Sequence, residues 1–144
     1  MTRRVFTAMV FAFVAIMVSV IAAQQPARSA SGWELPPDAD TIKNPLPVDA
    51  KLLATGKAIF KENCQKCHGA TGRGDGPDAD PDAAEDMDLT RAARAARNSD
   101  GVVFYKAWNG RRKPKMPAVK DKLTKEQVWA VVAYVQTLRK PATP

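Results

Sequence analysis

Five consecutive residues near the middle of the chain carry its most reactive side chains. Cys64, Cys67 and His68 stand in the sequence Cys-Gln-Lys-Cys-His, and the 144 residues include only 2 cysteines and 1 histidine. On a helix, residues three and four positions apart share a face, so the two thiols and the imidazole are expected to point the same way. The spacing C-x-x-C-H is the attachment signature of a c-type haem. It predicts two thioether bonds to one porphyrin, with the histidine as a ligand of its iron.

Other chemistries fit these five residues less well. A structural zinc site usually takes four cysteine or histidine ligands, and this chain has three. A thioredoxin-like C-x-x-C needs a βαβ context and a thiol of low pKa, and the chain has almost no run of alternating β-branched residues. A disulfide across two intervening residues would be strained and would leave His68 unexplained. One haem c, bound covalently through Cys64 and Cys67, is the predicted cofactor.

The N-terminus predicts export. The chain begins Met-Thr-Arg-Arg and then runs apolar from residue 5 to residue 23. Residues 1–23 are therefore expected to be a cleaved signal peptide or an uncleaved N-terminal membrane anchor. Either one places the remainder in the periplasm, soluble or tethered to the membrane. The formal charge is +7 and falls to +5 without the two N-terminal arginines.

The rest of the chain divides into a linker, one domain and a short tail. Residues 24–48 hold five prolines with little apolar periodicity, and this composition is typical of a semi-extended linker or tether. Residues 49–140 are expected to form the haem domain, and 141–144 a tail. The domain is predicted to be all-α, with no credible sheet. The first expected helix covers residues 50–62, with Asp49 as its N-cap. A short helix follows, with Arg91, Arg94 and Arg97 on a solvated face. The last two are residues 100–109, ending at Gly110, and a helix that opens with a capping box at Thr124.

Two features have more than one interpretation. Residues 75–88 carry seven acids and no base. They are expected to form a solvated loop, with a docking or metal patch as the alternative. Gly56 interrupts the first helix, where glycine costs about 1 kcal/mol relative to alanine. Close approach of another helix would explain it, and simple tolerance is the alternative.

In this order, the parts resemble a class I cytochrome c, the single-haem form, over residues 52–139. The resemblance is carried by Gly56-x-x-x-Phe60, the C-x-x-C-H motif, Gly76-Pro77, Met116-Pro117 and the aromatic-bearing helix 129–138. It implies about four short helices wrapped around one covalently attached haem. The first and last helices would cross at Gly56, with Phe60 near Trp129 or Tyr134. The carbonyl of Pro77 would accept a hydrogen bond from His68. The acidic insert after Pro77 departs from the family pattern.

Met116 is the predicted sixth ligand of the iron. No second histidine exists, and Met1, Met9 and Met17 belong to the N-terminal segment. Met87 lies between two aspartates, which is a poor place for a buried thioether. Met116 lies between Pro114 and Pro117, in a loop whose restricted dihedrals can hold a soft sulfur near iron. The alternative is that Met116 is a core side chain and the sixth position is open.

The expected function is single-electron transfer between periplasmic or membrane redox partners. With both axial positions filled, iron has no site for a substrate, so no enzymatic activity is predicted. The chain would act alone or as the cytochrome subunit of a larger oxidoreductase complex. Residues 106–125 carry eight bases and one acid, which would steer a redox partner with an acidic docking face, or else serve solubility. Nucleic acid is not an expected partner. The alternatives are a haem enzyme or gas sensor with a labile sixth site and, more remotely, a thiol-disulfide oxidoreductase.

Overall fold

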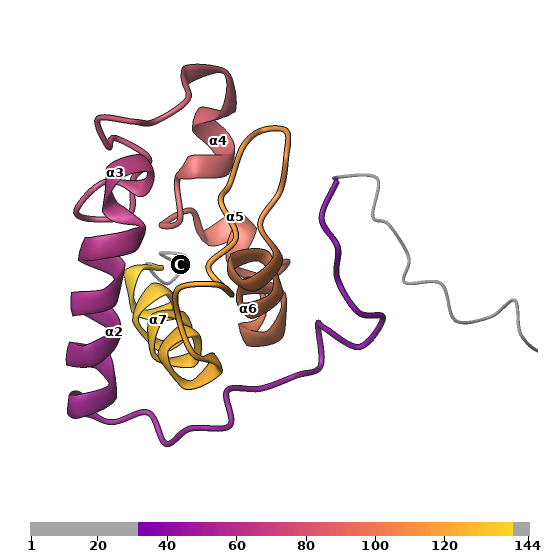
Figure 1. Ribbon diagram of the computed structural model, residues 1–144, viewed down its shortest axis with the longest axis vertical. Helices are drawn as coiled ribbons and strands as arrows, with labels where there is room; N and C mark the ends of the chain where they lie inside the picture. The colour runs from indigo at the N-terminus through magenta and orange to yellow at the C-terminus, as the bar shows by residue number, and fades with distance from the viewer. Residues whose placement is uncertain (1–31, 140–144) are drawn as a thin grey trace, which may run out of the picture.

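The computed structural model describes residues 32–139, which form a helical domain without strands (Figure 1). The segment predicted as a signal peptide or anchor and the tail lie outside these residues. The elements are α2 (Ala50–Asn63), α3 (Gln65–His68), the 3-10 turn η2 (Pro81–Ala83), α4 (Ala84–Met87), α5 (Ala92–Ala95), α6 (Asp100–Asn109) and α7 (Lys125–Leu138). The all-α prediction is confirmed. None of the described helices has the length and apolarity needed to cross a bilayer.

Helices α2 and α7 cross at Gly56, and α7 also packs against α6 (Figure 1). A Cβ atom placed on Gly56 would lie 2.0 Å from the carbonyl oxygen of Ala130, so only glycine allows the two backbones to approach this closely. Phe60 packs edge-on against Tyr134, with ring centroids 5.4 Å apart. Trp129 instead stacks on Phe104. The predicted crossing is therefore confirmed, with Tyr134 as the aromatic partner of Phe60.

The long helices begin and end where local signals place them. The Asp49 carboxylate accepts a hydrogen bond from the backbone N–H of Leu52, and α2 starts at the next residue after Asp49. Thr124 and Gln127 form both hydrogen bonds of a capping box at the start of α7. Gly110 ends α6 with a φ of 66°, a left-handed conformation that favours glycine.

Part of the segment predicted to be a linker packs on the domain. Trp33 and Ala39 are buried. The side chain of Asn44 donates to the carbonyl of Trp129 on α7, and the N–H of Gly101 on α6 donates to the carbonyl of Ile42. In Figure 1 this segment descends on the right of α6 and then runs beneath α7 to the start of α2. The folded body therefore extends N-terminally beyond the predicted boundary at residue 49.

The acidic stretch is not simply a solvated loop, which corrects the prediction. It forms η2 and α4, whose Ala83 and Met87 are buried. These two apolar residues are four positions apart, so one helical turn directs both toward the body of the domain. Asp86 forms ion pairs with Arg94 and with Arg111, so the prediction of a solvated Arg94 is also wrong. Asp75, Asp78, Asp82 and Glu85 remain exposed.

Candidate haem site

The predicted attachment motif lies at the junction of α2 and α3. The N–H of Cys64 donates to the carbonyl of Phe60 at the end of α2, and the N–H of His68 donates to the carbonyl of Cys64. Cys64, Cys67 and His68 are each half-buried, and all three line one cavity of about 230 Å³. Gly69 then ends α3 with a φ of 75°. The structure thus brings the three predicted residues together at one cavity.

A second cavity of about 90 Å³ adjoins the first and shares part of its lining. Cys64, His68 and Met116 line both cavities. Much of the smaller cavity's wall is apolar and comes from α2, α6, α7 and the segment after α4. These apolar residues are Phe60, Leu89, Val103, Val131 and Val135.

The imidazole of His68 is oriented by Met87. Its Nδ1 lies 2.8 Å from the Met87 carbonyl oxygen, which can only accept, so Nδ1 is the donor. Burial lowers the pKa of His68, although the Met87 hydrogen bond opposes this effect. A neutral ring with a proton on Nδ1 leaves Nε2 as a lone-pair donor, the form in which histidine binds metals.

The predicted acceptor, Pro77, is wrong. Pro77 is exposed, and the next N–H, of Asp78, donates to the carbonyl of Lys66 on the other side of α3. A Cβ on Gly76 would lie 2.1 Å from that Lys66 oxygen. Residues 76–78 therefore pack on the α3 backbone, and the chain reaches the His68 ring only ten residues later.

The Cys64 thiol does not resemble the nucleophilic thiol of a redox enzyme. Cys64 and Cys67 are not joined by a disulfide. Burial, followed by the neighbouring Cys67, raises the pKa of Cys64 to about 12. A catalytic thiol needs a lowered pKa, because the thiolate is the nucleophile. Within residues 32–139, no group of three or more histidine, cysteine or acidic side chains is placed to hold a metal ion, so the zinc interpretation gains no support.

Met116 lies on a closed loop beside the cavities. Its N–H and carbonyl both pair with the backbone of Arg111, at 2.8 Å each, so the intervening residues form a tight turn. Gly110 packs against this turn, since a Cβ there would lie 2.5 Å from the Met116 oxygen. Met116 is half-buried and lines both cavities together with His68.

Met87 is buried, with 7% exposure, so the prediction that its position is a poor place for a buried thioether is wrong. It also lines the larger cavity. However, its backbone lies on the Nδ1 side of His68, whereas a ligand opposite the histidine must face Nε2. Met116 comes from a separate loop and is free of this constraint.

Sequence reasoning missed several residues that line the cavities. Trp33 lines both, and its ring lies 4.2 Å from the Arg111 guanidinium carbon and 5.1 Å from Lys106 Nζ. Asp86 also lines both. Burial would raise the pKa of Asp86, but hydrogen bonds from Arg111 and Arg94 outweigh burial and lower it. A lone tryptophan in a proline-rich stretch was the one available signal for Trp33.

The donor set fits a haem. Apolar side chains can pack on a porphyrin, an imidazole and a thioether are established axial ligands of haem iron, and paired thiols can attach the ring. The fold and the site together define a helical domain of the haem-binding class. The model of the cytochrome c family matches residues 53–139, and the chain belongs to the cytochrome c family, whose domain implies haem c and haem-based electron transfer.

Among solved structures, the chain is similar to a chain of the reducing HAO-like protein complex of Kuenenia stuttgartiensis. The sequence identity is 28% and the TM-score is 0.55. The match covers 67% of this chain and 47% of the other. This chain thus spans about half the length of its neighbour.

Proposed function

We propose that this protein is a single-electron carrier with one haem c, attached through Cys64 and Cys67 and ligated by His68 and Met116. The observation that carries the proposal is that Cys64 and His68, from the motif at the α2–α3 junction, line the same two cavities as Met116, from a loop far along the chain. Family membership supports the haem and the electron transfer. The particular ligands and partners are our inference.

Each residue has a distinct task. Cys64 and Cys67 would hold the cofactor permanently, so it cannot dissociate between reactions. His68 would present Nε2 to the iron, with its ring fixed by the hydrogen bond from Nδ1 to the Met87 carbonyl. Met116 would present its sulfur from a loop closed by the two Arg111 hydrogen bonds. The haem, when bound, supplies a one-electron couple whose potential is raised by His/Met ligation.

Occupation of both axial positions favours electron transfer over catalysis. A loop closed by the two Arg111–Met116 hydrogen bonds would change little between oxidation states, and the apolar part of the cavity wall would limit water near the haem. Both properties limit the reorganisation that accompanies electron transfer. A labile Met116 would instead favour the haem enzyme or gas sensor, and the spectroscopy below distinguishes the two.

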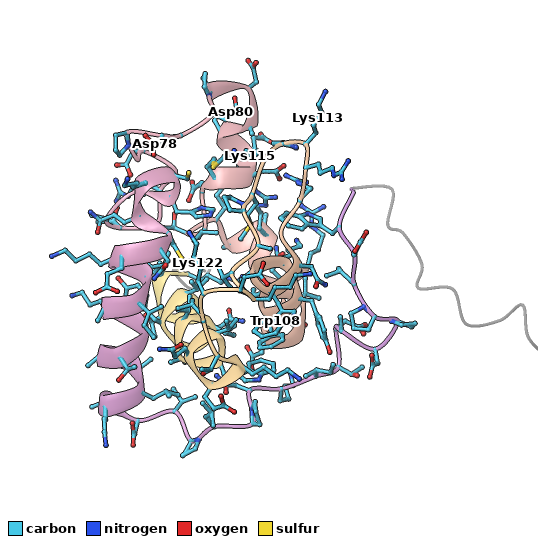
Figure 2. All side chains as sticks on the ribbon, in the orientation of Figure 1. Asp78, Asp80, Trp108, Lys113, Lys115 and Lys122 are labelled. Atoms are coloured by element: carbon cyan, nitrogen blue, oxygen red, sulfur yellow. The ribbon has the colours of Figure 1, made fainter. Side chains whose placement is uncertain are left out.

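The partners we propose are redox proteins with an acidic docking face. Lys66, Lys115 and Lys122 are exposed and line the larger cavity beside Cys67. Lys113 and Lys115 lie on the loop that carries Met116, whereas Asp78 and Asp80 lie on the neighbouring segment (Figure 2). The basic surface therefore has an acidic border on that side, which would orient a partner as well as attract it.

The neighbour's membership in a protein complex supports an association with protein partners, free or as a subunit. We further propose export to the periplasm, with residues 1–23 either cleaved or kept as a membrane anchor.

Two measurements test this function. Intact mass and a haem stain on a denaturing gel, taken on the exported protein, report covalent attachment and the mature N-terminus. The ferric absorption spectrum should be low-spin, with a weak far-red band from sulfur-to-iron charge transfer. A high-spin spectrum with rapid binding of external ligands would favour the enzyme or sensor. A colourless, iron-free but folded protein would refute a haem function altogether.

A further inference from the structure

Besides the exposed Lys66, Lys115 and Lys122, four cations from four different segments line the two cavities. Arg94 on α5, Lys106 on α6 and Arg139 after α7 line the smaller cavity, and Arg111 lines the larger one. Asp86 is paired with Arg94 and Arg111. Two arginines of this wall thus already hold one half-buried carboxylate of the chain itself.

Lys106 and Arg139 have no such partner. Lys106 Nζ donates to Oδ1 of Asn98 at 2.5 Å, and Arg139 Nη1 donates to the backbone carbonyl of Asn98 at 2.6 Å. Both acceptors are neutral. Among the described residues, no carboxylate lies within ion-pair distance of either cation, and the Nε of Arg139 is buried without a hydrogen-bond partner.

Two half-buried cations that converge on one neutral residue are partly desolvated, and a bound anion would offset that cost. Burial, together with the charges of Arg94, Arg111 and Arg139, lowers the pKa of Lys106 to about 8, although Asp86 opposes this effect. Burial also lowers the pKa of Arg139, although the charge of Asp100 opposes this effect from beyond ion-pair distance. An anion bound beside Lys106 and Arg139 would stabilise the charged forms of both side chains.

Resting on the function proposed above, we propose that Lys106 and Arg139 form a carboxylate-binding subsite that takes the two propionates of the haem. Both cations line the cavity that also contains His68 and Met116, so a ligand there can reach the iron ligands and the cations together. The ring of Trp33 lies against Lys106 and Arg111, where it limits water and strengthens the pairing.

The test compares reduction potentials of the holoprotein at pH 7. In Lys106→Gln the side-chain amide can still donate to Asn98, so a purely structural role is retained while the charge is lost. Lys106→Arg keeps the charge. Lys51→Gln is the matched control, because Lys51 is an exposed cation in the first turn of α2. Arg139→Gln and Arg139→Lys repeat the comparison at the second cation.

We expect Lys106→Gln and Arg139→Gln to lower the potential, because an unpaired propionate stabilises ferric iron. Each shift should be several-fold larger than that of Lys51→Gln, should persist at high salt where an exposed charge is screened, and should largely disappear in Lys106→Arg and Arg139→Lys. Shifts equal to that of Lys51→Gln would overturn the subsite. The haem stain and the far-red band would then still support the electron carrier, whereas their absence in the wild-type protein would refute the carrier itself.

Discussion

The substitution Gly56→Ala tests the crossing of α2 and α7, on which the position of the haem motif depends. By helix propensity alone, alanine would stabilise α2 by about 1 kcal/mol. The added Cβ would lie 2.0 Å from the carbonyl oxygen and 2.6 Å from the carbonyl carbon of Ala130, and 3.1 Å from Cβ of Tyr134. Because the obstructing atoms belong to the backbone, no rotamer change relieves the contact, and one helix must shift by about 1 Å or more.

Overpacking of this kind costs about 1–3 kcal/mol, and a rigid backbone obstacle places Gly56→Ala at the upper end. After subtraction of the propensity gain, the expected net loss is about 2 kcal/mol. For a domain of this size, such a loss lowers the melting temperature by about 8–16 °C.

The assay is denaturant unfolding of the holoprotein, followed by circular dichroism. Ala54→Gly is the control, because Ala54 is exposed on the same helix and its replacement reports propensity alone, a loss of about 1 kcal/mol. The midpoint for Gly56→Ala should fall below that of the control, with an unchanged slope. If Gly56→Ala were as stable as the wild type or more so, the close crossing would be refuted.

Three further outcomes are expected. Met116→Ala should abolish the far-red band of the ferric spectrum, whereas Met87→Leu should keep it; the opposite pattern would make Met87 the ligand. Replacement of both Lys113 and Lys115 by glutamate should slow bimolecular electron transfer to an acidic partner at low salt. The difference in rate between variant and wild type should fade at high salt. An unchanged low-salt rate would mean that these lysines are only a solvated surface. Thr124→Ala should cost about 1 kcal/mol in thermal unfolding, since it removes the side-chain half of the α7 capping box, and an unchanged midpoint would contradict that role.

The elements that the sequence predicted well are those whose signals are local. The cap at Asp49, the capping box at Thr124 and the stop at Gly110 each act within one turn of helix, so adjacent residues suffice to predict them. The crossing at Gly56 came from a resemblance, because an isolated glycine does not identify the residue that approaches it. The three residues of the haem motif were predictable because their spacing alone brings them to one face.

The acidic stretch was predicted less well because its structure depends on partners far along the chain. Seven acids within fourteen residues suggested solvation, yet Asp86 is held by Arg94 and Arg111, the second of them 25 residues away. That anchoring brings the backbone carbonyl of the next residue, Met87, within hydrogen-bond distance of His68 Nδ1. Composition averages over a segment, whereas a single residue facing inward decides where the segment lies. The acceptor for His68 could therefore not be read from the spacing of Gly76 and Pro77.

The residues that form the candidate site begin before the family match. The family match starts at residue 53, and the proline-rich composition before it suggested a free tether. An extended chain without internal helices can still dock if a few side chains fill specific positions. Trp33, twenty residues before the start of the match, docks in this way: its ring packs against Lys106 and Arg111 at the cavity wall. A domain trimmed to the family boundaries would lose Trp33 and leave the Lys106 and Arg111 side chains more exposed to water. Among the described residues of the segment before α2, Trp33 is thus part of the cavity wall.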